Sequence, residues 1–361
     1  MYTSRALVAT TANLHMSEKK ETEMDIANTL LDATTRSEII EILLSKLREN
    51  YVFPNVAEEM EESMRRRLSG GEYNDITTGE AFAETLTVHL QEISKDKHLQ
   101  VFYSSAQEPA RKDVAAPSET YRNSLWLLKN YGFEKVERLP GNIGYLDFRA
   151  FYPVELAGEV AIAALNFLAN TTALIVDLRK NHGGEPALVA LMCSYFFDSE
   201  PVHLNSLYWR ASNRTQQFWT LPYVPGRRYL NKPVYVLTSH ETFSGAEEFT
   251  YNLKSLKRAT IIGEITGGGA HPGDVYTINA HFTIFIPTGR AINPITGSNW
   301  EGTGVIPDIE VLQEEALKVA HVMALKKVLE DIGDTPTQAQ EFFVQELQET
   351  LARLERANHE A

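Results

Sequence analysis

Apolar residues recur every three to four positions through the front part of the chain. The segment SEIIEILLSKLREN carries one such stripe, and GEAFAETLTVHLQEI carries a second. The stripes consist of Ile39, Leu43 and Leu47, and of Phe82, Leu86 and Leu90. This spacing is typical of helices that bury one face. We therefore predict a helical N-terminal domain over residues 25–103, preceded by a disordered N-terminus over residues 1–24.

The pattern changes near residue 143. Apolar runs of strand length, rich in β-branched residues, appear at IGYLDF, TALIVDLR, PVYVLTS, ATIIGE and HFTIFIP. Helical segments are predicted at 155–169, 185–197 and 245–257. Strands that alternate with helices indicate a layered α/β domain with partly parallel strands, which we place at residues 118–312. The polar segment 104–117 reads as a linker, and residues 313–361 are predicted to form C-terminal helices.

Length, charge and composition narrow the classes of protein. A chain of 361 residues suggests roughly two domains, and 43% hydrophobic with 23% charged residues suits a globular protein. The formal net charge of −14 opposes binding to nucleic acid or to an anionic membrane surface. No apolar run approaches the roughly 18 residues that span a bilayer. We expect a soluble protein without a nucleic-acid partner.

The single cysteine, Cys193, lies in an apolar run and is expected to be buried. One cysteine forms no intrachain disulfide, so nothing in the chain depends on an oxidising compartment. The N-terminal apolar run of about five residues is shorter than the usual apolar core of a secretory signal, about 7–15 residues. We expect a cytoplasmic protein, with export as the alternative.

Ser244 stands in TSHETFSGAEEF, between a predicted strand and a predicted helix. It is either the N-cap of that helix or a nucleophile. Serine is among the best N-cap residues, which favours the structural interpretation. The N–H groups at a helix start can also stabilise an oxyanion, and Gly245 lets a substrate backbone approach. Both interpretations remain open at this point.

A serine nucleophile needs a base within hydrogen-bond reach. Lys254 and Lys257 lie along the same predicted helix, about 15 and 20 Å from Ser244 at 1.5 Å per residue, so neither can reach it. The candidate imidazoles are those of His98, His182, His240 and His271. Spacing along the chain does not choose among them.

Four separated motifs occur in the order VDLRKNHGG, TSHETFSGAEEF, IGEITGGGAHP and NWEGTGVIPDIEV. Through these motifs and their order, the chain resembles a family of serine peptidases. The family includes the tail-specific (C-terminal processing) proteases, the tricorn protease core and the modules of interphotoreceptor retinoid-binding protein, and the resemblance covers residues 25–312. The resemblance implies a crotonase-like (ClpP-like) α/β fold with an N-terminal helical bundle and C-terminal helices. No PDZ segment is evident.

The resemblance also implies roles for individual residues. Ser244 corresponds to the nucleophile of the family, while Gly269 stands where the tail-specific branch has its lysine base. The chain is therefore closer to the tricorn-like branch, where His98 of KDKHLQV would be the base and Glu301 of NWEGTG would orient it. His240 is the rival base.

The loop VDLRKNHGG would supply the second oxyanion donor in this family, from Gly183 or Gly184, beside the N–H of Gly245. We expect Asp177, Arg179 and Asn181 to hold that loop.

Three further patterns give weaker indications of substrate, nucleotide or metal binding. Arg290 and His240 are possible substrate contacts, although a structural ion pair is the simpler interpretation for Arg290. GEITGGGAHPG lacks the Gly-Lys-Ser/Thr of a phosphate loop. No metal-ligand motif appears, and we expect neither metal nor cofactor.

The sequence thus predicts a serine peptidase that cleaves a peptide or protein substrate through a Ser-His-Glu triad and an acyl-enzyme. One alternative is a non-catalytic carrier of a retinoid-like or other apolar ligand. Another is an esterase or acyl transferase with the same triad, because fold does not fix the substrate. Substrate specificity and oligomeric state stay open.

Overall fold

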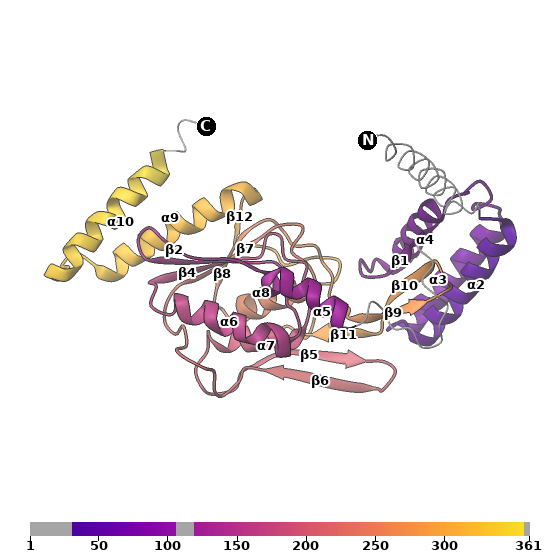
Figure 1. The fold of residues 1–361 in the computed structure, drawn as a ribbon, viewed down its shortest axis with the longest axis horizontal. Helices are drawn as coiled ribbons and strands as arrows, with labels where there is room; N and C mark the ends of the chain where they lie inside the picture. Colours follow the sequence, from indigo (N-terminus) through magenta and orange to yellow (C-terminus); the bar gives the residue numbers. More distant parts are fainter. Residues whose placement is uncertain (1–30, 106–118, 357–361) are drawn as a thin grey trace, which may run out of the picture. The chain divides into compact units, whose positions relative to one another are not determined.

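A computed structural model describes residues 31–105 and 119–356 (Figure 1). These residues fall into two compact units. The first combines 31–105 with 273–288, and the second combines 119–272 with 289–356. The predicted N-terminus 1–24 and most of the predicted linker 104–117 lie outside the described residues.

Three helices form one layer of the first unit: α2 (Ala33–Asn50), α3 (Pro54–Ser69) and α4 (Gly79–Ser94). The side chains of Asp32 and Thr78 cap α2 and α4, and a proline opens α3. The apolar stripes predicted from the sequence pack together in one buried core.

The first unit also contains a three-stranded antiparallel sheet. Its order is β1 (Gln100–Tyr103), β10 (Phe282–Pro287), β9 (Gly273–Thr277). The run HFTIFIP thus forms a strand as expected, but β10 pairs with β1 and its buried side chains join the helical core. The helical front of the chain is therefore completed by strands from much later in the sequence.

A six-stranded sheet forms the centre of the second unit, in the order β12-β8-β7-β4-β3-β2. The strands are β2 (Phe133–Leu139), β3 (Ile143–Phe148), β4 (Ala173–Asp177), β7 (Val234–Thr238), β8 (Thr260–Gly263) and β12 (Ile309–Glu310). All neighbours from β3 to β12 pair in parallel, and only β2 is antiparallel. The carboxyl ends of the parallel strands therefore meet at one edge.

Helices cover both faces of this sheet (Figure 1). One face packs against α6 (Val154–Leu168), α7 (Pro186–Ser194) and α8 (Gly245–Ser255). The other packs against α9 (Gln313–Ile332) and α10 (Gln338–Arg356). Successive strand residues alternate between the two cores, so Ile175 faces α9 whereas Val176 faces α6–α8. Both faces are apolar, as expected for a buried parallel sheet.

Smaller elements complete the second unit. The helix α5 (Glu119–Leu128) and the 3-10 turn η1 (Asn130–Gly132) precede β2. A separate antiparallel sheet has the order β11 (Gly289–Ile292), β5 (His203–Trp209), β6 (Arg214–Trp219). Cys193 is fully buried in α7. Among the described residues, the helices fall short of the length and apolar character that crossing a membrane requires.

Candidate active site

The chain makes a sharp turn at Ser244, between the end of β7 and the start of α8. Ser244 has φ 53° and ψ −121°, a backbone conformation that residues with a side chain rarely adopt. An N-cap residue normally has extended φ/ψ. Strain of this kind is stored mainly at functional sites, and a strand–turn–helix turn exposes a nucleophile in other hydrolases. The conformation favours a role beyond capping.

Hydrogen bonds around Ser244 hold the turn in place. Its N–H donates to Glu247 Oε2 at 2.9 Å, as one half of a capping box between Ser244 and Glu247. Ahead of it, Thr242 Oγ1 donates to the carbonyl of Leu178 at 2.8 Å. The backbone of Ser244 is therefore fixed from both sides of the turn.

The loop after β4 lies directly against this turn. Gly183 and Gly184 have φ of 93° and 134°, which only glycine adopts readily. A Cβ on Gly183 would stand 2.7 Å from Cβ of Ser244, and a Cβ on Gly245 would stand 2.9 Å from the nitrogen of Gly184. The predicted glycines of the two motifs thus meet, and each must lack a side chain for the loops to fit.

Asn181 organises this loop. Its Oδ1 accepts from the N–H of Gly183 at 2.8 Å, and its Nδ2 donates to the carbonyl of Phe148 at 2.9 Å. Its carbonyl accepts from the N–H of Phe243 at 3.0 Å. The N–H of Gly183 is therefore occupied. Within the described residues, the N–H groups of Gly184 and Gly245 have no acceptor.

Glu301 follows the short segment after β11. Its Oε2 accepts from the N–H of Ala270 at 2.5 Å and lies 3.3 Å from His271 Nδ1. Both side chains are largely buried, with 14% and 7% of their surface exposed. An imidazole in contact with Glu301 thus comes from the candidate His271, within the same unit.

His98 lies in the first unit, in the turn between α4 and β1. Its N–H donates to Asp96 Oδ1 at 3.1 Å, and its ring stacks on Phe285 with centroids 5.8 Å apart. Asp96 in turn accepts from the hydroxyl of Tyr51 at 3.2 Å. His98 is well held inside its own unit. Because Ser244 belongs to the other unit, their pairing stays a prediction.

The remaining predicted candidates are exposed or make other contacts. His240 is 68% exposed and pairs with Glu264 at 3.1 Å. His182 is exposed, and Arg290 lies on β11 with its guanidinium 5.4 Å from the ring centroid of Tyr208. Lys254 bonds Asp308 at 2.6 Å, far along α8 from its start.

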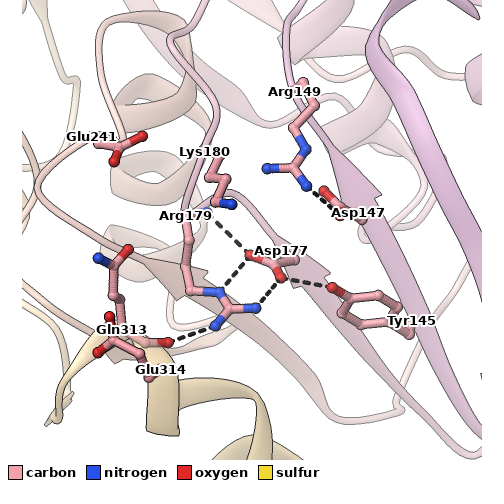
Figure 2. A pocket seen from close by; sticks show the side chains of 9 residues that line it. All are labelled: Tyr145, Asp147, Arg149, Asp177, Arg179, Lys180, Glu241, Gln313 and Glu314. Carbon is pink, nitrogen blue, oxygen red and sulfur yellow. Dashed lines mark hydrogen bonds and ion pairs between the residues drawn. The ribbon is translucent and has the colours of Figure 1, made fainter.

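A polar pocket with a cavity volume of about 330 Å³ opens at the carboxyl ends of β3 and β4 (Figure 2). Asp177 accepts from Arg179 Nη2 at 2.5 Å and from the hydroxyl of Tyr145 at 2.7 Å. Burial alone would raise the pKa of Asp177, but the Arg179 guanidinium outweighs it and holds this pKa below its usual value. Lys180 and Glu241 also line this pocket (Figure 2).

Arg179, which lines this pocket, also stabilises the segment that leads to the nucleophile turn. The carbonyl of Arg179 accepts from Ser239 Oγ at 2.5 Å, and the guanidinium of Arg179 pairs with Asp177. These contacts hold the start of the glycine loop against the segment that leads to Ser244. The expectation that Asp177, Arg179 and Asn181 hold the loop agrees with these bonds.

Glu247, which is fully buried three residues after Ser244, was not among the site residues predicted from the sequence. Burial raises its pKa to about 6, although its hydrogen bonds to Thr266, Gly269, Gly268 and Ser244 act in the opposite direction. The signal that would have found it is the Ser-x-x-Glu spacing of a capping box at a helix start.

Comparison with known proteins adds two family matches. Residues 142–311 match the model of "Peptidase family S41", and residues 23–125 match that of the N-terminal domain of this peptidase in eukaryotic IRBP. Together they span most of the chain.

Two solved structures resemble the fold. A lipoprotein from Streptococcus agalactiae is 15% identical, with a TM-score of 0.52, over 81% of this chain and 96% of its own. A protein from Parabacteroides merdae, described as a candidate peptidase, is 18% identical, with a TM-score of 0.53, over 77% of this chain and 90% of its own. At this identity they bear on the fold alone, and the expected mixed α/β fold class is confirmed.

Proposed function

Because the chain belongs to peptidase family S41 and is a serine-type peptidase, we propose that Ser244 is its nucleophile, with His98 as general base and Glu301 as the group that orients the imidazole. The observation that carries this proposal is the strained turn at Ser244, packed against a glycine loop, where among the described residues the N–H of Gly184 in the loop and that of Gly245 at the start of α8 have no acceptor. A helix cap alone requires neither feature.

The proposed reaction has two halves. His98 removes the proton from Ser244 Oγ as the oxygen bonds to the substrate carbonyl carbon, and the imidazolium then protonates the departing amine. The remaining acyl-enzyme ester is attacked by water, whose proton passes to the same imidazole. Ser244 regains its proton as the carboxylic acid product leaves.

The oxyanion is assigned to the N–H groups of Gly245 and Gly184. The sequence does not decide whether Gly183 or Gly184 supplies the second oxyanion donor, but the N–H of Gly183 already donates to Asn181 Oδ1. That of Gly184 is beside Gly245 and has no acceptor among the described residues. Two such donors, one at the start of α8 and one in the loop packed against it, stabilise developing negative charge without rearrangement during the reaction.

Two imidazoles compete for the role of base. The family resemblance supports His98, whose motif matches that of the tricorn-like branch. The 3.3 Å contact between His271 and Glu301 supports His271 instead, because an orienting carboxylate should touch its imidazole. We keep His98 as the proposal and His271 as the rival.

Two other functions share this scaffold. A carrier of an apolar ligand would need no acceptor-free oxyanion donors, and the strained Ser244 counts against it. An esterase or acyl transferase would use the same groups on a different acyl compound. A peptide or protein remains the substrate that the family favours.

Labelling with a fluorescent fluorophosphonate tests the proposal. We expect covalent modification of Ser244 in the wild type and none in Ser244→Ala, located by mass spectrometry of tryptic peptides. His240→Ala, which alters an exposed histidine four residues away, is the matched control and should label normally. Labelling that persists in Ser244→Ala, or a wild type that never labels and cleaves no peptide in a proteome-derived library, would refute the mechanism.

A further inference from the structure

The loop of residues 266–270 lies between the nucleophile turn and the segment that carries Glu301. Glu247 on α8 joins the loop from one side. Its Oε2 accepts from the N–H of Ser244 at 2.9 Å and from that of Gly269 at 2.8 Å. Its Oε1 accepts from the N–H of Gly268 at 2.6 Å and from Thr266 Oγ1 at 2.5 Å. One carboxylate thus bonds the nucleophile and the loop.

The segment 300–305 joins the same loop from the other side. Ala270 donates its N–H to Glu301 Oε2 at 2.5 Å, and the indole of Trp300 donates to the carbonyl of Gly269 at 2.7 Å. Val305 donates its N–H to Thr266 Oγ1 at 2.6 Å, and the N–H of Gly302 donates to the carbonyl of Gly268 at 3.0 Å. A continuous set of hydrogen bonds therefore connects Ser244 with Glu301.

We propose that Glu247 is a positioning residue for the reaction, one that fixes the Ser244 backbone relative to the loop that holds Glu301. This inference rests on the proposed function of Ser244. Glu247 is completely buried and acts through its neighbours, so it has no role in contacting substrate.

The chemistry of the site explains why the residue is a glutamate. Four donors converge on two oxygens, and a carboxylate can accept all four. In a glutamine the amide nitrogen would face two of those donors, and hydrogen bonds on that side would be lost. An aspartate is one methylene shorter and cannot span the same gap. Small displacements of reacting groups lower rates by about 10²-fold, so a shift of Ser244 would be felt mainly in the chemical step.

The neighbouring Glu248 supplies an internal control. It is also buried on α8, at 4% exposure, and lies near the side chains of Asn205 and Asn252; among the described residues no hydrogen bond joins its carboxylate to the loop 266–270. Both Glu247→Gln and Glu248→Gln remove a buried carboxyl from the same helix. Only the first disturbs the connection between Ser244 and Glu301.

The test measures the kinetics of Ser244 labelling by the fluorophosphonate, separating the maximal rate from the half-saturating concentration. We expect Glu247→Gln to lower the maximal rate about 10²-fold while the half-saturating concentration stays within about twofold. Glu248→Gln should change neither. Thermal melting of each variant establishes that it is folded.

A second pair of variants keeps the idea testable if Glu247→Gln does not fold. Thr266→Val removes the hydroxyl that bonds both Glu247 and Val305, whereas Thr266→Ser keeps it. We expect a slower maximal rate in the valine variant and near-normal labelling in the serine variant. Equal maximal rates in wild type, Glu247→Gln and Thr266→Val would overturn the positioning role while leaving Ser244 as the nucleophile. A wild type that does not label would instead reject the proposed function.

Discussion

The two halves of the candidate site differ in how they are built. The nucleophile half lies within one unit, where short-range hydrogen bonds from Asn181, Glu247 and the backbone fix Ser244 and the glycine loop. The half that holds His98 lies in the other unit, fixed by Asp96 and Phe285. The oxyanion donors are thus preorganised by local structure, whereas the proposed base depends on the meeting of two units. Substitutions in the two halves should therefore behave differently.

The largest effect is expected from the proposed base. His98→Ala should lower kcat/KM about 10²–10⁴-fold on a fluorogenic peptide that the wild type cleaves, because it removes the general acid–base group. His271→Ala should have a smaller effect, through the packing of Glu301. If His271→Ala loses most of its kcat/KM while His98→Ala keeps the wild-type value, the base belongs to the nucleophile's own unit. The comparison between the halves then no longer holds.

A smaller effect is expected from the glycine loop. Gly184→Ala should reduce kcat about 10²–10³-fold, the usual result of losing one oxyanion donor, because a Cβ there would collide with the carbonyl of Phe151. Gly297→Ala is the matched control: it also has positive φ, at 65°, but no atom lies within 4 Å of its Cβ position. Equal kcat in the two variants would dissociate Gly184 from the oxyanion site. Steady-state kinetics on the same peptide measures both.

The smallest effect on activity, but a clear one on stability, is expected at Glu248. Burial raises its pKa from the usual 4.5 to about 8, although the nearby side chains of Asn205 and Asn252 act in the opposite direction. Between these two pH values the unfolded chain ionises while the folded protein stays protonated, so the wild type loses stability as pH rises.

Glu248→Gln removes this dependence. The variant should melt at a higher temperature than the wild type at pH 8, and the difference should shrink towards pH 4.5. Each kcal/mol moves the Tm of a domain of this size by about 2–4 °C. Parallel Tm profiles from pH 5 to pH 8 would show that Glu248 is not buried in its neutral form. They would also weaken its value as the control for Glu247.

Much of the fold could be predicted because the local pattern specifies it. The runs at β3, β4, β7 and β8 are apolar on both faces, and the helices α6, α7 and α8 begin within a residue or so of their predicted starts. The pairing of HFTIFIP with β1 could not be predicted. Its apolar and β-branched residues suit a strand in either sheet, and partner choice is a long-range property.

Some features of the candidate site could likewise be predicted from the sequence, and others could not. Ser244 and its glycines could be located from motifs and from their place at a helix start. The backbone conformation of Ser244 and the occupied N–H of Gly183 could not, because both depend on contacts between loops far apart in the sequence. The contact between His271 and Glu301 is of the same kind.

The late strands of the first unit also constrain how the chain folds during synthesis. Leu86 and Val101 emerge early, yet they share a core with Phe282 and Ile284, which are made far later. The core of the second unit is also completed late, because α9 near the C-terminus covers one face of its sheet. Domains usually fold one after another as they leave the ribosome. Here neither unit can complete its interior until most of the polypeptide has been translated, so nascent chains must keep apolar surface exposed for much of their synthesis.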